Sequence, residues 1–147
     1  MEHSFHMLLY RAFHAQRHYL RPSLREAGLE PGQPKLLEYL CRYGACPQRK
    51  LADFFEIDSA AVSRMLDGME REGLIFRRTN AASRRSNLVE VTEKGRQAYQ
   101  IWQQCCQEME QVLLQGFSQK EKEALFGYLS RIYQNFQEDK EVRSCRT

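Results

Sequence analysis

The chain has 147 residues and a net charge of +3 at pH 7, which suits a single domain with a substantial core but leaves no room for a separate catalytic domain. So mild a charge does not by itself point to nucleic acid, and no apolar run approaches the roughly 20 residues that a membrane span needs. The N-terminus lacks the pattern of a secretion signal, so we expect a cytoplasmic protein with no membrane partner.

The first predicted element is a long helix from residue 5 to about residue 27. Apolar residues recur close to three and four positions apart along it, and Gly28 is placed to end it. Pro22 is expected to be a kink or an early break. His14 and His18 share one face, as metal ligands would, but no acidic or cysteine ligand accompanies them. We therefore predict no metal site and no cofactor.

The next predicted helix begins at Gln33 and Pro34 and runs to Gly44. The turn that follows places Cys46 at the predicted N-cap of a further helix. A thiol there feels the positive end of the helix, which would lower its pKa and raise its thiolate fraction. Cys46 is therefore the candidate redox thiol, and the simpler alternative is a small residue that caps the helix as serine does. The five cysteines of the chain are odd in number and include no CxxC pair, which fits a reducing compartment.

Two short helices are predicted next. The first starts near Pro47 and is anchored by three apolar residues on one side, Leu51, Phe54 and Phe55. The second begins at the capping residues Asp58 and Ser59 and ends at Gly73. Its helically spaced apolar residues, expected to be buried, are Val62, Leu66 and Met69.

The N-terminal turns of the second short helix leave small, hydroxylic and basic residues outside. These residues are Ser59, Ala60, Ala61, Ser63 and Arg64. A face of this kind can enter a major groove without obstruction, donate to phosphate through its N–H groups, and place an arginine against base edges.

Two β runs, at residues 74–76 and 88–91, come next, and a connector that is basic at both ends joins them. Between residues 76 and 96, two acidic residues stand against six basic ones, which are Arg77, Arg78, Arg84, Arg85, Lys94 and Arg96. Contact with phosphate requires such a local excess of positive charge. Two helices followed by a basic hairpin have the order of a winged helix-turn-helix, so we predict double-stranded DNA as the partner.

Two helices close the chain. Thr92 is the predicted N-cap of a glutamine-rich helix that runs to Gly116, and Ser118 with Glu121 forms a capping box before the last helix. The polar end of the chain is expected to fray beyond residue 136. The apolar stripe of the last helix is Leu125, Phe126, Leu129, Ile132, Tyr133 and Phe136.

The predicted fold class is mostly α with a small β-hairpin wing, a winged helix-turn-helix with N- and C-terminal dimerisation helices. The single domain 1–147 would comprise a DNA-binding lobe, 33–96, and a helical dimerisation lobe, 1–28 and 97–139. The terminal helices carry more apolar surface than a small winged module can cover, so they pack either on their own module or on a second copy. Two-fold symmetry, which sets two reading helices roughly 34 Å apart, favours a homodimer on a pseudo-palindromic operator.

The chain resembles the multiple antibiotic resistance regulator (MarR) family of winged-helix transcription factors. The matching stretches are LADFFEID (51–58), AAVSRMLDGMEREGLIFRR (60–78), SRR (83–85) and VEVTEKG (89–95). The resemblance implies a repressor, and in such relatives a small aromatic or phenolic effector enters between the reading module and the dimer helices. The residues that we place near such a cleft are His14, Arg17, His18, Tyr39 and Trp102, and the alternative is that they belong to the core or an interface.

We predict that Ser63 and Arg64 carry most of the direct base readout, with Ser59 and Ala61 in the same groove. The predicted phosphate contacts are Lys50, Arg77, Arg78 and Arg96, and the wing residues Arg84 and Arg85 would reach the backbone or an adjacent minor groove. For Arg77 the alternative is an ion pair with a nearby carboxylate.

An enzyme is not predicted. The sequence has no Gly-rich phosphate loop and no HExxH, and all four histidines lie within the first eighteen residues. Two alternatives to a ligand-released repressor remain: a thiol-based redox-sensing regulator acting through Cys46, and a helical protein-interaction module without DNA binding.

Overall fold

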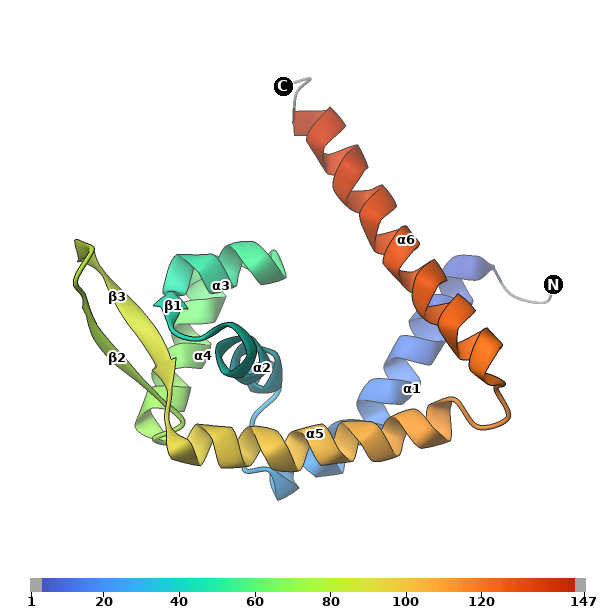
Figure 1. The fold of residues 1–147 in the computed structure, drawn as a ribbon, viewed down its shortest axis with the longest axis horizontal. Helices are drawn as coiled ribbons and strands as arrows, with labels where there is room; N and C mark the ends of the chain where they lie inside the picture. The colour runs from blue at the N-terminus through green and yellow to red at the C-terminus, as the bar shows by residue number, and fades with distance from the viewer. Residues whose placement is uncertain (1–3, 145–147) are drawn as a thin grey trace. The chain divides into compact units, whose positions relative to one another are not determined.

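The computed structural model describes the backbone of residues 4–144 and the side chains of residues 4–82 and 87–141. Within this part of the chain the helices are α1 (Phe5–Glu26), α2 (Gln33–Tyr43), α3 (Gln48–Phe55), α4 (Ser59–Arg71), α5 (Glu93–Leu113) and α6 (Gln119–Ser144) (Figure 1). The strands are β1 (Cys46–Pro47), β2 (Ile75–Asn80) and β3 (Ser83–Val91). These elements confirm the predicted fold class. The chain forms two compact units, Met1–Met109 and Glu110–Thr147.

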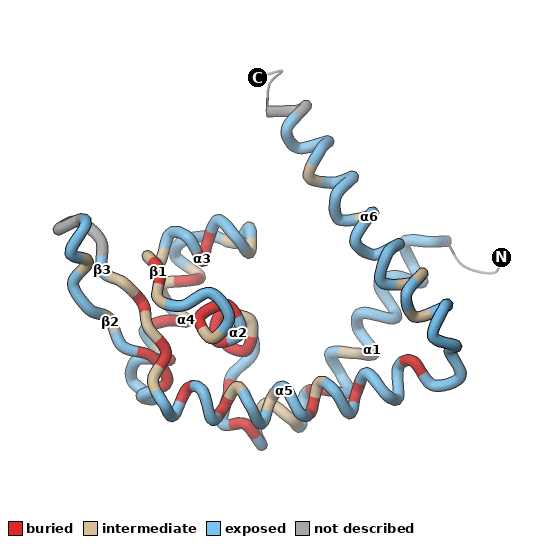
Figure 2. The backbone as a smooth tube through the Cα atoms, in the orientation of Figure 1, coloured by how far each residue is buried: buried red, intermediate tan, exposed pale blue. Residues whose placement is uncertain are grey.

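The core of the first unit lies where α2, α3 and α4 meet the base of the β2–β3 hairpin, and buried positions gather there (Figure 2). As predicted, the buried residues of α4 are Val62, Leu66 and Met69. A second, smaller cluster joins Leu20 of α1 to Cys105 and Met109 of α5. The amphipathic pattern of α4 therefore fixes which face of this helix remains outside.

The first helix is as long as predicted, and Pro22 does not break it. Ser4 caps it by accepting a hydrogen bond from the N–H of Met7 at 3.3 Å, and the helix continues past Pro22 to Glu26. Because Pro22 lies near the C-terminal end, the missing N–H costs little helical structure beyond it.

The start of α3 differs from the prediction. Pro47 is the N-cap residue, and Cys46 lies one residue earlier in β1, where it pairs with Val89 of β3. The predicted capping role of Cys46 is therefore wrong, because its backbone belongs to the sheet. Of the three expected anchors of α3, Leu51 is buried and Phe55 half-buried, whereas Phe54 is 52% exposed.

The three strands form one antiparallel sheet in the order β1-β3-β2. The wing strands are longer than predicted, because most of the expected connector is paired, as in Thr79 opposite Asn87. Only residues 81 and 82 separate the strands, and the side chain of Asn80 accepts a hydrogen bond from the N–H of Ala82 at 3.0 Å. The added strand residues are mostly polar, so apolar alternation in the sequence does not indicate them.

The predicted caps of the last two helices are confirmed. The Thr92 hydroxyl accepts a hydrogen bond from the N–H of Gly95 at 3.0 Å, at the start of α5. Ser118 and Glu121 form the capping box of α6, in which the Ser118 N–H donates to the Glu121 carboxylate at 2.8 Å. The helix α6 does not end near residue 136 as predicted but continues to Ser144, since glutamate, lysine and glutamine are good helix formers even when polar.

Among the described residues, no helix is both long and apolar enough to cross a membrane.

Candidate nucleic-acid interface

The N-terminal turns of α4 are open to solvent. Ser59, Ala60 and Arg64 are exposed, and Ala61 and Ser63 are half-buried. Asp58 is the N-cap residue, as predicted, but within residues 4–82 and 87–141 its side chain accepts no hydrogen bond from an N–H of the first turn. The first N–H groups of α4 therefore point outward, at the positive end of the helix dipole, where an anion is favoured.

Arg64 of α4 differs from Arg77 and Arg78 of the wing. It has no ion pair among the residues whose side chains are described. Ala60 and Arg64, four residues apart and both exposed, lie on one face of α4, away from its buried residues. A long arginine side chain beside small residues is suited to reach the edge of a base.

Arg77 of β2 has a different environment. Its guanidinium donates to Asp67 at 2.9 Å and to Glu70 at 3.1 Å, two carboxylates on α4, and its side chain is only 20% exposed. The structure thus favours the ion-pair alternative for Arg77 over a free phosphate contact. The two ion pairs hold the wing against the reading helix.

The other predicted phosphate contacts vary. Arg78 forms an ion pair with Glu90 across the hairpin, at 2.6 Å, and remains about half exposed. Lys50 and Arg96 are exposed and form no ion pair with any side chain of the described part. The side chains of Arg84 and Arg85 lie outside the described residues.

Cys46 is buried, and burial raises the pKa of its thiol, with Lys50 acting weakly in the opposite direction. The expected lowering of this pKa is therefore wrong. Position explains the difference, since the thiol lies in the sheet and not at the end of a helix.

The five residues expected around an effector do not meet in one cavity. His14 and His18 line an open hollow of about 810 Å³ along α1, but Arg17 lies over the ring of Phe13, at 5.8 Å. Tyr39 is buried in the core, where it contacts the rings of Tyr43, Phe54 and Phe55, and Trp102 packs between the two apolar clusters. The core alternative therefore describes Tyr39 and Trp102 better.

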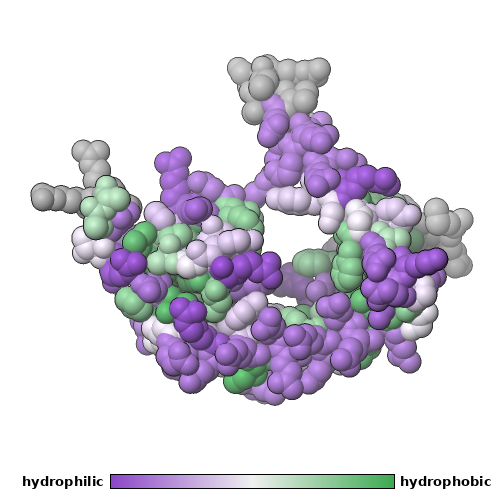
Figure 3. Space-filling view, viewed as in Figure 1, coloured by the Kyte–Doolittle hydropathy of each residue, from purple (hydrophilic) through white to green (hydrophobic). Residues whose placement is uncertain are grey.

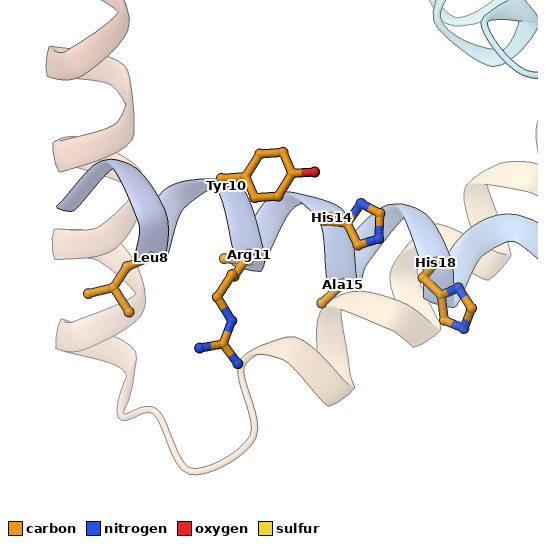
Figure 4. Close-up of a pocket in the computed structure, with 7 residues that line it drawn as sticks. Leu8, Tyr10, Arg11, His14, Ala15 and His18 are labelled. Atoms are coloured by element: carbon orange, nitrogen blue, oxygen red, sulfur yellow. The ribbon is translucent and has the colours of Figure 1, made fainter. Parts of the chain in front are cut away.

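The hollow on α1 is lined by residues of that helix, namely Leu8, Tyr10, Arg11, Ala12, His14, Ala15 and His18. Tyr10 and His14 rise from the same side of α1, and their rings stack at 5.8 Å (Figure 4). Sequence reasoning missed Tyr10 and Arg11, although their positions four and three residues before His14 would have placed them beside it.

The acidic partners of Arg77 were also missed. Asp67 and Glu70 are three apart on α4, a spacing that brings both to one side of the helix. Nothing in the sequence indicated which arginine of the wing would reach them. Within residues 4–82 and 87–141, no group of three or more metal-ligating side chains gathers.

Comparison with known proteins places this arrangement in a family. The family model described as "MarR family" matches residues 29–86. The regulator YxaD of Bacillus subtilis, described as an uncharacterized HTH-type transcriptional regulator, is 30% identical over 80% of this chain and 83% of its own length. A second B. subtilis regulator of the same description, YybA, is 28% identical over 63% of the chain, which spans 61% of its length.

Solved structures agree. The crystal structure of a putative MarR family transcriptional regulator from Listeria monocytogenes, complexed with 26mer DNA, superposes with a TM-score of 0.81 at 27% identity. It covers 95% of this chain, and the chain covers 92% of it.

Proposed function

The chain belongs to the MarR family of winged helix-turn-helix transcriptional regulators, and we propose that it acts as a homodimeric repressor that reads a pseudo-palindromic operator through α4 and is released by a small aromatic effector. The exposed N-terminus of α4 is the observation that carries this proposal. Its N-terminal turns expose Ser59, Ala60 and Arg64, while its apolar face is held in the core. A related structure in complex with 26mer DNA supports DNA as the partner.

Exposed apolar residues on the terminal helices support a homodimer. In the first unit, Phe5, Leu9 and Phe13 of α1 are all more than 40% exposed. In the second unit, α6 exposes Phe126, Leu129, Tyr133 and Phe136. Hydrophobic side chains also reach the surface in the space-filling view (Figure 3). Exposed apolar side chains that gather on a helix are costly in water, and a second copy of the chain would bury them under two-fold symmetry.

The hollow on α1 supports an effector with an aromatic ring and an acidic group. Tyr10 and His14 offer ring faces, and Arg11 supplies a cation at the same hollow. A thermal-shift screen with aromatic acids tests this role, and an Arg11→Ala variant should lose most of the shift. An equal shift in that variant would place the effector elsewhere.

Binding to duplex DNA tests the function as a whole. The protein should bind its own upstream DNA tightly, and its affinity for random duplexes should fall steeply between about 50 and 200 mM salt, as counterion release requires. If the chain is instead a helical protein-interaction module, it should bind random duplexes hardly at all, even at low salt. That result would overturn the proposal.

The redox alternative has less support. A buried thiol with a raised pKa reacts slowly, because the thiolate is the reactive form. No observation on Cys46 favours it over an effector at α1.

A further inference from the structure

The end of α4 and the start of α5 share one hydrogen-bonded joint. The helix α4 closes with Gly73 in the left-handed region, at φ 74°. The N–H of Gly73 donates to the backbone carbonyl of Glu70 at 3.0 Å, and the N–H of Leu74 donates to that of Met69 at 2.9 Å. This pair of backbone hydrogen bonds is the pattern of a Schellman turn. It leaves three successive carbonyls, those of residues 72, 73 and 74, directed away from the helix.

All three carbonyls accept hydrogen bonds from the first residues of α5 and its cap. Lys94 Nζ donates to the carbonyl of Glu72 at 2.6 Å. The Thr92 hydroxyl donates to that of Gly73 at 2.6 Å, and the Thr92 N–H donates to that of Leu74 at 3.0 Å. The same Thr92 oxygen accepts from the N–H of Gly95, so one side chain closes α4 and opens α5.

Two further features tighten the joint. A Cβ on Gly95 would overlap the carbonyl oxygen of Leu74 and lie 2.8 Å from a methyl carbon of Val91, so only glycine lets the first turn of α5 pack this closely. The Lys94 ammonium lies at the C-terminal, negative end of α4, where a cation is favoured.

The hairpin that forms the wing leaves and re-enters the chain at this joint. Its strands run from Ile75 to Val91, directly between α4 and Thr92. Arg77 holds the same hairpin to α4 through Asp67 and Glu70. The reading helix, the wing and the first turn of α5 are therefore bound together as one body.

We propose that Thr92, Lys94 and Gly95 are positioning residues for DNA reading. They fix the angle between α4 and α5 and, because α5 leads along the chain to α6, they set the separation of the two reading helices. This inference rests on the proposed homodimer and operator. It predicts that the joint controls the spacing of the half-sites, whereas the outer face of α4 controls their sequence.

Selection from a pool of random DNA duplexes tests the proposal, because each recovered duplex reports half-site sequence and half-site spacing separately. The full chain would be compared with Thr92→Val and Lys94→Met, which remove hydrogen bonds to the end of α4. Lys120→Met, an exposed lysine at the start of α6, is the matched control. Gly95→Ala is a more severe third variant, and circular dichroism would show which variants are folded.

The wild-type chain and Lys120→Met should return one half-site at one spacing. Thr92→Val and Lys94→Met should return the same half-site, with the share of duplexes at the wild-type spacing reduced about fivefold or more, as expected when one side-chain hydrogen bond of Lys94 or two of Thr92 are lost. Folded variants that keep the single wild-type spacing would overturn the inference and leave the proposed function intact. A wild-type chain that enriches no half-site would overturn the proposed function and this inference with it.

Discussion

The environment of the arginines is where the structure departs most from the prediction. Arg64 of α4 and Arg77 and Arg78 of the wing were all expected to contact DNA, with an ion pair as the alternative for Arg77. Only the folded chain brings Asp67 and Glu70 beside Arg77 and Glu90 beside Arg78. Sequence patterns give the charge of a segment, but partners that are distant along the chain are set by how the elements pack.

Arg64→Ala and Arg77→Ala should therefore differ in their effect on stability. Loss of Arg77 breaks two partly exposed ion pairs and should lower the free energy of unfolding by about 0.5 to 1 kcal/mol. Loss of Arg64 should leave stability within about 0.5 kcal/mol of the wild type, since it has no ion pair among the described residues. Urea unfolding of both variants measures the difference. Equal stability losses would contradict the assignment.

Cys46 should be a slowly reacting thiol. Because it is buried and its pKa is raised, a thiol reagent at neutral pH should label it far more slowly in the native protein than in urea. Comparison of the wild type with Cys46→Ser isolates its contribution. Fast native labelling of this one thiol would restore the redox alternative.

At the scale of elements, helices were predicted better than strands. Helical periodicity and caps gave α1, α4 and the start of α6 closely, because local spacing determines which face is buried. The length of the wing strands was underestimated, because the extra residues are polar and pair without apolar alternation. The two-residue strand β1 was missed for the same reason, and with it the true environment of Cys46.

The reading helix depends on its buried face. Leu66 is fully buried, so Leu66→Ala should lower the free energy of unfolding by about 2 to 5 kcal/mol. The midpoint of chemical denaturation measures this loss, and Arg64→Ala, two residues away on the exposed side, is the control. A cost of less than about 1 kcal/mol would show that α4 is not anchored as described.

The cap of α6 should depend on pH. Hydrogen bonds from the side chain and backbone of Ser118 lower the pKa of Glu121 below its ordinary value of 4.5. A carboxyl whose folded pKa is lowered stabilises the fold above the unfolded pKa, and this contribution disappears as the pH falls through the folded pKa. Between about pH 6 and about pH 3 the wild type should thus lose more thermal stability than Glu121→Gln.

Glu123→Gln, an exposed carboxamide substitution two residues further along α6, serves as the control and should behave like the wild type. If Glu121→Gln and the wild type lose stability in parallel on acidification, the ionised cap is not the stabilising form.

At the scale of the whole molecule, the family and the order of elements could be predicted from the sequence, but the places where distant side chains meet could not. The expected effector residues lie in different places. Tyr39 and Trp102 pack in or against the apolar clusters, whereas His14 and His18 lie on an exposed face of α1. Aromatic residues at helical spacing look the same in sequence whether they pack or bind. Only their burial separates the two roles.

The proposed homodimer can be tested at α6. Phe136 is 64% exposed, so Phe136→Asp should leave the fold intact and shift the protein from dimer to monomer in analytical ultracentrifugation. Tyr43→Asp, at a tyrosine of α2 that is 59% exposed, is a control that should stay dimeric. A Phe136→Asp protein that remains a dimer would place the interface elsewhere.

The central claim is that the outer face of α4 reads bases, and base discrimination by Arg64 tests it most directly. Dissociation constants would be measured for a tight-binding duplex and for variants with one base pair changed at each position, using wild type and Arg64→Ala. Arg64→Ala should lose about 1 to 3 kcal/mol of discrimination at one base pair in each half-site, while Lys50→Ala weakens binding to all the duplexes alike. An Arg64→Ala protein that discriminates at every position as the wild type does would contradict the account.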